Sequence, residues 1–341
     1  MTTPALDATA RALVPPGKGI LAADESHPSI AKRFEALGIE NTAENRRVYR
    51  QMLFTTPGVA EYISGVILFD ETIRQKADDG ATLVEVLTRQ GIVPGIKVDK
   101  GAKPLAGAPG ELVTEGLDGL RERLAEYREL GARFAKWRAV IDIGDGIPTQ
   151  YCLDVNAHAL ARYAALCQDE GIVPIVEPEV LMDGDHSIGR CFEVTTRTLH
   201  AVFDELIDQR IQLDGMLLKP NMVIPGKKHS AGKASPEAVA RATVACFRNV
   251  VPAAVPGIVF LSGGQSDGEA TANLDAINKL GPHPWQVSFS YGRALQAAAL
   301  SAWLGRDANA AAGQKAFLHR AHMNGLARDG KWTPDAEKAA G

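Results

Sequence analysis

The 341-residue sequence predicts a single-domain (β/α)8 barrel, a TIM barrel. Short apolar runs, rich in β-branched residues and bounded by turn residues, recur eight times along the chain, and helical patterns lie between them. Strands that are apolar throughout are typical of a parallel sheet buried on both faces. An open doubly wound sheet is the alternative architecture. It favours a Gly-x-Gly-x-x-Gly loop after the first strand, where this chain reads AADESHPSI, so we expect the eight units to close into a barrel.

The eight predicted strands are spread along the whole chain. They lie, in order, within residues 17–25, 63–71, 93–101, 133–141, 172–180, 214–223, 257–265 and 285–293. We therefore take residues 1–341 as one domain, with residues 1–16 as an N-terminal arm. Residues from about 329 to 341 are polar and rich in alanine and glycine, which predicts a loose C-terminal tail.

Apolar residues three and four positions apart predict helices between several strands. The repeat is clear in residues 117–131, where Gly131 is a plausible stop. The helix of residues 235–251 is expected to begin at Ser235 as its N-cap, with Pro236 in the first helical position, where a proline leaves no extra donor unsatisfied. The same repeat occurs in residues 156–171 and 266–280.

Charge and composition argue against several classes of protein. The formal net charge is -4 and aromatic residues make up 6% of the chain, whereas nucleic-acid-binding proteins are usually basic. No apolar run approaches the roughly 20 residues of a membrane span, and the first residues do not form the apolar segment of a signal peptide. The four cysteines form no Cys-x-x-Cys pair, which fits free thiols in a reducing cytosol. We expect a cytoplasmic protein that binds neither nucleic acid nor membrane.

The histidines do not indicate a metal site. The 8 histidines are scattered along the chain without the spacing of a ligand cluster. The nearest candidate is the segment DGDH at residues 183–186, which is more simply interpreted as a solvated loop. We therefore expect no bound metal.

Polar residues stand at the carboxyl ends of most predicted strands, where a barrel of this kind places its active site. For one such residue, contact with water at a strand end is explanation enough. Ser26 or Ser29, for example, is by default the N-cap of the following helix. Contact with water does not explain several charged residues within apolar runs, because the hydration that they lose has to be compensated by other groups. The strand-end residues are Asp24, Asp70, Lys97, Lys136, Glu177, Lys219, Ser262 and Ser290.

Two lysines occupy unusual positions in this pattern. Lys219 directly follows the apolar run of residues 216–218, and Lys136 lies within the fourth strand. Two neighbouring ammonium groups repel each other, which lowers the pKa of one of them, and a neutral lysine can attack a carbonyl and form a Schiff base. The alternative interpretation is an ion pair with Glu177 or Asp24. The two interpretations are compatible, because a Schiff-base lysine also needs carboxylates around it.

Glu177 and Glu179 lie two positions apart in the fifth strand, so their side chains face the same way. Pro178 between them favours an extended backbone for Glu177. Paired carboxylates can divide into an acid and a base when their environments differ. The alternative is a salt bridge that both share with a lysine.

Glycine-containing loops after the seventh and eighth strands indicate an anion site. Gly263 and Gly264 allow backbone N–H groups to approach an anion, and Arg293, after Gly292, can clamp it. A lone Ser-Gly-Gly is usually only a turn. Because loops after these two strands often bind phosphate in such barrels, the pair of loops predicts a phosphate site.

The sequence resembles the class I fructose-bisphosphate aldolases of the animal and plant type. The resemblance runs from about residue 17 to about residue 334 with few gaps, and composition and spacing alone do not indicate an aldolase. Its motifs, in order, are GKGILAADES, NRRVYRQMLF, GVILFDET, GIKVDKG, FAKWR, GIVPIVEPE, LLKPNMVIPG, FLSGGQS and FSYGRALQ.

The resemblance implies an activity and catalytic residues. The activity is reversible cleavage of fructose 1,6-bisphosphate to dihydroxyacetone phosphate and glyceraldehyde 3-phosphate, in glycolysis and gluconeogenesis, through a lysine imine and an enamine. It implies Lys219 as the imine-forming residue, with Lys136 beside it and Glu177 as the acid and base of imine formation and hydrolysis. Asp24 would handle the proton of the C4 hydroxyl, and Glu179 would orient the lysines. The imine serves as electron sink, so no metal or organic cofactor is required.

The resemblance also implies the residues that bind sugar phosphates. The ketose-side phosphate is assigned to Ser262, Gly263, Gly264, Gly292 and Arg293, with Ser290 adjacent. The far phosphate is assigned to Ser26, Ser29, Arg33, Lys97 and Arg138. A homotetramer is typical of the family.

The sequence departs from the family pattern at its end. Members usually have a longer tail that finishes in a tyrosine, which aids proton exchange on the enamine, whereas the last tyrosine here is Tyr291. Three alternatives remain: an aldolase that prefers fructose 1-phosphate or sedoheptulose bisphosphate, a phosphosugar-binding protein without catalysis, and a zinc-dependent aldolase. The second is disfavoured because Lys219, Lys136, Glu177 and Asp24 occur together, and the third by the scattered histidines.

Overall fold

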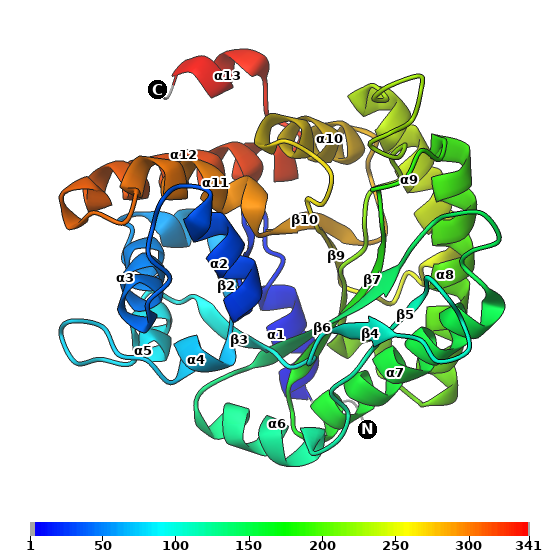
Figure 1. Ribbon diagram of the computed structural model, residues 1–341, viewed down its shortest axis with the longest axis horizontal. Helices are drawn as coiled ribbons and strands as arrows, with labels where there is room; N and C mark the ends of the chain where they lie inside the picture. Colours follow the sequence, from blue (N-terminus) through cyan, green and yellow to red (C-terminus); the bar gives the residue numbers. More distant parts are fainter. Residues whose placement is uncertain (1–3, 340–341) are drawn as a thin grey trace.

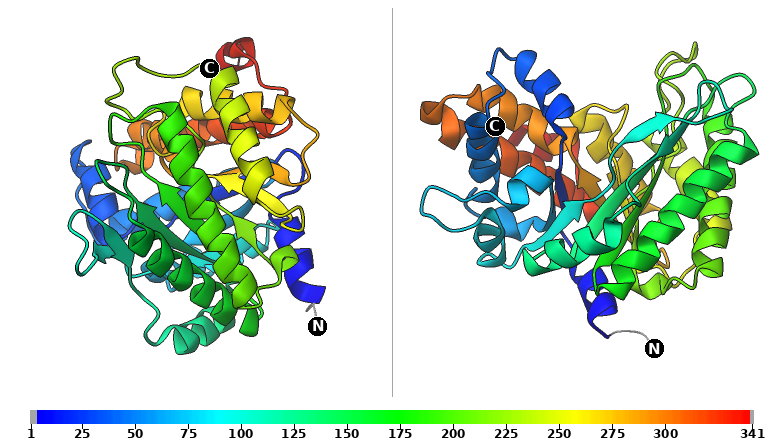
Figure 2. Two further views of the ribbon diagram at one scale, coloured as in Figure 1. Left: turned by 90° about the vertical axis from the view of Figure 1, so that its right-hand side faces the viewer. Right: turned by 60° about the horizontal axis from the view of Figure 1, so that its bottom comes forward.

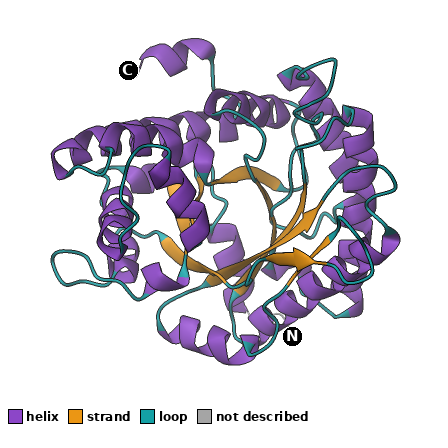
Figure 3. Ribbon diagram, in the orientation of Figure 1, coloured by secondary structure: helices purple, strands orange, loops and turns teal. Residues whose placement is uncertain are grey.

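The computed structural model describes residues 4–339, which form a closed barrel of eight parallel strands surrounded by helices (Figure 1, Figure 3). Neighbouring barrel strands follow one another along the chain, and β10 pairs with β1 to close the ring. Each predicted strand range contains one barrel strand, so the predicted (β/α)8 fold is confirmed. The barrel strands are β1 (Gly19–Ala23), β2 (Ile63–Leu68), β3 (Val93–Lys97), β6 (Phe134–Ile141), β7 (Val173–Val180), β8 (Leu217–Leu218), β9 (Gly257–Phe260) and β10 (Gln286–Tyr291).

The described residues form thirteen α-helices, most of which surround the barrel (Figure 3). They are α1 (Pro4–Ala12), α2 (His27–Glu35), α3 (Ala43–Phe54), α4 (Asp70–Ile73), α5 (Leu83–Thr88), α6 (Leu120–Glu129), α7 (Gln150–Asp169), α8 (Ile188–Asp208), α9 (Pro236–Val250), α10 (Asp267–Lys279), α11 (Arg293–Trp303), α12 (Ala310–Arg328) and α13 (Pro334–Ala339). Short 3-10 helices lie at Val59–Glu61, Leu213–Gly215 and Asp307–Asn309. The four helices predicted from periodicity are α6, α7, α9 and α10. Ser235 caps α9 as expected, because its hydroxyl accepts a hydrogen bond from Ala238 N.

A small antiparallel sheet, β4 (Ala102–Pro104) with β5 (Leu112–Thr114), was not predicted. Its strands have three residues each, too few to show an alternating pattern. The sheet is attached to the barrel because Thr114 Oγ1 donates a hydrogen bond of 2.7 Å to the carbonyl oxygen of Arg138 on β6. It therefore holds the segment after β3 against the strand that carries two of the predicted site residues.

The N-terminal arm closes the lower end of the barrel, which is the end at which the strands begin. Four apolar residues of the arm are buried against the lower interior of the barrel, where the ring of Phe134 also packs. They are Leu6 and Ala10 of α1, and Leu13 and Val14 after it. The right-hand view in Figure 2 shows α1 below the strands. The apolar lower half leaves the upper half, at the carboxyl ends of the strands, for polar side chains.

The expectation of a loose C-terminal tail is wrong for the described part of that segment. Residues 334–339 form α13, and the turn before it is held in place because the backbone N–H of Trp332 donates to Asp275 Oδ1 at 3.0 Å. Glu337 of α13 pairs with Arg320 of α12 and accepts a hydrogen bond from the Trp332 indole at 3.0 Å. The polar composition of the segment wrongly indicated a loose tail, because its polar groups bind the buried residues Asp275 and Arg320. Residues 1–3, 340 and 341 lie outside the described part of the chain.

Two further features bear on the sequence predictions. Cys152, Cys167, Cys191 and Cys246 are free thiols and all are buried. Within residues 4–339, no helix combines the length and the apolar character needed to span a bilayer.

The tight packing of the barrel interior leads to a stability prediction. A methyl group at Gly95 would lie 2.3 Å from the ring of Phe134, which is fully buried between strands that cannot move apart freely. Gly95→Ala is therefore expected to lower the free energy of unfolding by about 1–3 kcal/mol, as overpacking of cores does. Gly268→Ala is the matched control, because a methyl group there meets no atom within 4 Å. Urea unfolding of both variants checks the prediction. Equal stability of the two variants would contradict the packing described.

Candidate active site

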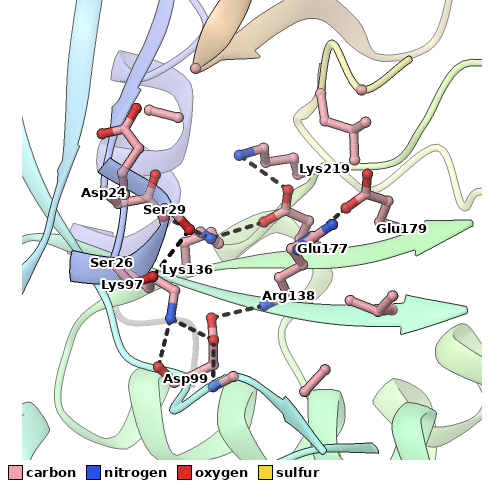
Figure 4. Close-up of a pocket in the computed structure, with 18 of the residues that line it drawn as sticks. Asp24, Ser26, Ser29, Lys97, Asp99, Lys136, Arg138, Glu177, Glu179 and Lys219 are labelled. Carbon is pink, nitrogen blue, oxygen red and sulfur yellow. Dashed lines mark hydrogen bonds and ion pairs between the residues drawn. The ribbon is translucent and has the colours of Figure 1, made fainter. Parts of the chain in front are cut away.

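A cavity of about 1180 Å³ opens at the carboxyl ends of the barrel strands (Figure 4). Every residue that the sequence assigned to catalysis or substrate binding lines it. These residues come from all parts of the chain, and only the closed barrel brings them together. Asp24 follows β1; Ser26, Ser29 and Arg33 lie at or in α2; Lys97 ends β3; Lys136 and Arg138 lie on β6; Glu177 and Glu179 lie on β7; Lys219 follows β8; Ser262, Gly263 and Gly264 follow β9; Ser290 lies on β10; Gly292 and Arg293 begin α11.

A chain of alternating charges forms the floor of the cavity. Lys219 Nζ lies 3.2 Å from Glu177 Oε1, and Lys136 Nζ lies 3.2 Å from Glu177 Oε2. Lys136 Nζ also lies 2.8 Å from Asp24 Oδ2. These four residues are at most 9% exposed. Glu177 is therefore shared by two buried ammonium groups, as Figure 4 shows.

The strand register explains this arrangement. Side chains two positions apart on a strand face the same way, so Lys136 and Arg138 on β6 both point into the cavity, as do Glu177 and Glu179 on β7. Arg138 is the register partner of Glu177 in the β6–β7 pair. Lys219 is held at the end of the very short strand β8 because its backbone N–H donates to Val176 O at 2.8 Å. The ion pair of Lys219 with Glu177, one of the two interpretations offered by the sequence, is present.

The charges of this cluster shift the pKa values of its members. Burial raises the pKa of Asp24, but the ammonium groups of Lys136 and Lys219 outweigh burial and hold that pKa well below its ordinary value. Burial lowers the pKa of Lys136, but Asp24 and Glu177 outweigh burial and raise it above its ordinary value. The repulsion between the lysines thus does not lower the pKa of Lys136, because two carboxylates surround its ammonium group.

Glu179 differs from Glu177 in its partner. It forms an ion pair with Arg138, the other inward-facing residue of β6, and not with either lysine. Burial raises the pKa of Glu179, and its pairing with Arg138 opposes this only in part. The two glutamates therefore lie in different environments, as the sequence suggested, but Glu179 does not orient the lysines through a direct ion pair.

The loops after β9 and β10 form a compact polar corner of the cavity. Gly264 has a positive φ of 78°, and a side chain there would begin 2.1 Å from Met182 Cγ, so only glycine fits. Arg293 Nη2 donates a hydrogen bond of 2.9 Å to the carbonyl oxygen of Gln265, which holds the start of α11 against the β9 loop. The hydroxyl of Ser290 is buried and has no hydrogen-bond partner in the described chain, so it is free to bind a ligand.

The remaining cationic and hydroxyl groups lie around α2 and β3. Ser26 occupies the N-cap position of α2, but its side chain caps nothing and instead lies 3.1 Å from the Ser29 hydroxyl, contrary to the default interpretation. Lys97 Nζ lies 2.6 Å from Asp99 Oδ1. Sequence reasoning missed Asp99 as a site residue, although its position two residues after Lys97 in the motif GIKVDKG was a usable signal.

Arg33 lies closer to the loop of β10 than its sequence assignment implied. A side chain at Gly292 would begin 3.8 Å from Arg33 Nη2. Gly292 was grouped with the ketose-side phosphate and Arg33 with the far phosphate. The structure instead places Arg33 beside the ketose-side group, because α2 runs along the mouth of the barrel next to α11 (Figure 1).

The described residues offer little for a metal ion. Within residues 4–339, groups of three or more His, Cys, Asp or Glu side chains arranged to hold a metal are absent. The DGDH segment is not wholly solvated as expected, because His186 is buried, although Asp183 at its start is exposed and pairs with Lys227 at 2.6 Å.

The fold and site together define a class of protein: a (β/α)8 barrel whose cavity holds a buried lysine among carboxylates and cationic groups. Comparison with known proteins agrees. A family model described as glycolytic fructose-bisphosphate aldolase class-I matches residues 5–341. The chain is 60% identical to the "Probable fructose-bisphosphate aldolase class 1" of Xanthomonas campestris over 97% of this chain and 99% of that protein. It is 55% identical to "Fructose-bisphosphate aldolase C" of Rattus norvegicus over 96% and 91% of the two chains.

Solved structures give the same result. A fructose-bisphosphate aldolase from Plasmodium falciparum, crystallised in complex with TRAP and a small-molecule inhibitor, superposes with a TM-score of 0.95 and 50% sequence identity. The alignment covers 96% of this chain and 95% of that one. The chain therefore belongs to the class I fructose-bisphosphate aldolase family, whose members are metal-independent lyases.

The depressed pKa of Asp24 leads to a prediction for stability against pH. Because the folded-state pKa lies below the unfolded value of about 3.9, the ionised carboxylate stabilises the fold above that pH, and this contribution is lost as the pH falls. Between about pH 5 and pH 3, the free energy of unfolding of the unmodified protein should fall more steeply than that of Asp24→Asn, by up to about 1 kcal/mol per pH unit. Urea unfolding at a series of pH values measures this. Asp118→Asn, at an exposed position, is the control, and parallel curves for Asp24→Asn and the unmodified protein would contradict the prediction.

Proposed function

We propose that the protein cleaves fructose 1,6-bisphosphate reversibly to dihydroxyacetone phosphate and glyceraldehyde 3-phosphate, with Lys219 as the imine-forming residue. The observation that carries the proposal is the position of Lys219 Nζ, buried in the cavity and 3.2 Å from Glu177 Oε1. A lysine must lose a proton before it attacks a carbonyl, and Glu177 is the carboxylate within reach to accept that proton.

Imine formation needs an acid as well as a base. After Lys219 attacks C2 of the ketose, the carbinolamine hydroxyl leaves as water once it is protonated. Glu177, having taken a proton, can return it at this step. Lys136 remains protonated because its pKa is raised, so it serves as a fixed positive charge beside the reacting carbon and not as a second nucleophile.

Cleavage of the C3–C4 bond requires a base for the C4 hydroxyl. We assign this role to Asp24, whose carboxylate lines the cavity 2.8 Å from Lys136 Nζ and is ionised, because the neighbouring ammonium groups keep its pKa low. As the C4 hydroxyl gives up its proton, the electrons of the C3–C4 bond pass into the iminium ion and form an enamine on Lys219. The aldehyde product leaves, C3 is protonated, and hydrolysis of the imine releases the ketose phosphate.

The distribution of cations supports a substrate with a phosphate at each end. The ketose-side phosphate is assigned to the loops after β9 and β10, where Ser262, Gly263, Gly264, Ser290, Gly292 and Arg293 gather, joined by Arg33. The far phosphate is assigned to Ser26, Ser29, Lys97 and Arg138. A ketose monophosphate would leave the far group without an anion, so we propose that the bisphosphate is preferred over fructose 1-phosphate.

Assembly and location follow from the family. Relatives include a protein named "Fructose-bisphosphate aldolase 4, cytosolic" from Arabidopsis thaliana, 54% identical over 96% of this chain. We propose a homotetramer in the cytoplasm that uses neither a metal nor an organic cofactor and associates with neither nucleic acid nor membrane. Sedimentation analysis at micromolar concentration tests the tetramer, and a monomer would contradict it.

Substitutions at the cavity floor test the proposed roles. Lys219→Arg retains the charge beside Glu177 but cannot form an imine, so cleavage should fall below detection while the fold is kept. Glu177→Gln removes the proposed acid and base and should lower kcat by about 10² to 10⁴. Both are measured by coupled assay of the triose products, with Lys315→Arg, at an exposed position outside the cavity, as control.

The same assay distinguishes the alternatives. Activity on fructose 1,6-bisphosphate should persist after treatment with EDTA and exceed activity on fructose 1-phosphate or sedoheptulose bisphosphate. Inactivation by EDTA, or undiminished activity of Lys219→Arg, would contradict the proposed mechanism. Absence of turnover on every ketose phosphate would indicate a protein that only binds such sugars.

A further inference from the structure

A buried guanidinium group lies directly behind the phosphate end of the cavity. Arg50 on α3 is 2% exposed, and its Nη2 lies 2.7 Å from Glu25 Oε2. The other carboxylate oxygen of Glu25 accepts a hydrogen bond from Arg33 Nη1 at 2.5 Å. Glu25 and Arg33 line the cavity, whereas Arg50 lies behind them. The mechanism above gives no role to Glu25 or Arg50.

The cluster contains two guanidinium groups but one carboxylate, so its net charge is positive. Glu25 Oε1 also accepts a hydrogen bond from Gln296 on α11 at 2.8 Å, and the Gln296 amide oxygen accepts one from the Tyr49 hydroxyl at 3.1 Å. These contacts fix the carboxylate between α2, α3 and α11. In contrast, Nε and Nη1 of Arg50 have no hydrogen-bond partner within residues 4–339. The Arg50 guanidinium also lies over the Tyr49 ring, 5.7 Å from its centroid. This contact leaves Nε and Nη1 without an acceptor, so packing and hydrogen bonding do not by themselves account for a second buried guanidinium beside one carboxylate.

The position of Arg33 shows what the extra charge can do. Arg33 Nη2 lies next to Gly292, at the loop where an anion would also meet Arg293. An anion that arrives there competes with Glu25 for Arg33. If Arg33 were the only cation near Glu25, that carboxylate would hold the guanidinium and repel the anion. With Arg50 present, Glu25 keeps a partner after Arg33 turns to the anion.

We propose that Arg50 is a positioning residue that neutralises Glu25, so that Arg33 can exchange Glu25 for the phosphate of the substrate. The inference rests on the proposed function only in taking the anion to be a sugar phosphate. Arg50 itself does not touch the substrate. Its contribution is the net positive charge that the Glu25–Arg33–Arg50 cluster presents to the phosphate.

Charge counting makes the inference testable. The cluster carries a net charge of about +1 with Arg50, or with lysine in its place, and about 0 in Arg50→Met. It returns to about +1 in the double variant Glu25→Gln/Arg50→Met, in which Arg33 alone is charged. A role that depends on charge therefore predicts that Glu25→Gln rescues Arg50→Met, whereas a purely structural role for Arg50 does not.

The ligand for the test is a hexitol 1,6-bisphosphate, which has both phosphates but no carbonyl and so binds without imine chemistry. Calorimetric titration should show affinity weakened about tenfold or more in Arg50→Met, and within about threefold of the unmodified protein in Arg50→Lys. The double variant should also return to within about threefold. If Arg50→Met does not fold, the affinity of the double variant tests the inference by itself. The double variant is expected to fold because neither position 25 nor position 50 then holds an unpaired buried charge.

Two outcomes would overturn the inference. One is unchanged affinity in Arg50→Met, and the other is a double variant that binds the hexitol bisphosphate as weakly as Arg50→Met or about tenfold more weakly than the unmodified protein. Because this measurement requires no turnover, its failure is separate from failure of the proposed function, which is judged by cleavage of the ketose bisphosphate.

Discussion

Glu177 lies between two buried ammonium groups, and the arrangement of the active site depends on this shared carboxylate. Its two oxygens each lie 3.2 Å from a lysine nitrogen, and the second lysine continues the chain to Asp24 at 2.8 Å. Removing one partner of a buried ion pair typically costs about 3–5 kcal/mol, because the other charge is left without compensation. The four groups therefore constrain one another. They also create the chemical difference between the lysines, because Lys136 contacts two carboxylates whereas Lys219 contacts one.

The barrel can hold such a cluster because its interior is divided into two halves. The lower half is apolar and closed by α1, and rings such as Phe134 fill it so tightly that Gly65 and Gly95 have no room for a side chain. The upper half contains the buried charges and the cavity. Stabilisation from apolar burial in the lower half offsets the cost of desolvated charges in the upper half. Register links the two halves, because a shift of one residue in β6 would turn Lys136 and Arg138 away from the cavity.

The sequence predicted the barrel and the members of the site better than it predicted their contacts. Apolar runs between turn residues were sufficient to locate the strands, because parallel strands are buried on both faces. The motifs named the lining residues correctly. They could not show that Glu179 pairs with Arg138, because this contact joins two strands. They also did not show that the Ser26 hydroxyl lies against the Ser29 hydroxyl and leaves α2 uncapped. The raised pKa of Lys136 was missed for the same reason, since its two carboxylates come from different strands.

Other features escaped prediction because their stabilising partners are remote in sequence. The strands β4 and β5 are too short to show a pattern and are held by contacts to β6 and α7. The helix α13 was mistaken for a tail because its polar residues gave no sign that Glu337 meets Arg320 and Trp332. The closeness of Arg33 to Gly292 was not predicted, because position along α2 does not reveal which loop the helix faces.

The most direct test of this account asks which of the two buried lysines reacts with the ketose. Dihydroxyacetone phosphate is mixed with the protein, borohydride is added, and the modified peptide is identified by mass spectrometry. We expect a reduced adduct on Lys219 and none on Lys136, because Asp24 and Glu177 hold Lys136 in its protonated form. An adduct on Lys136, or no adduct on either lysine, would contradict it.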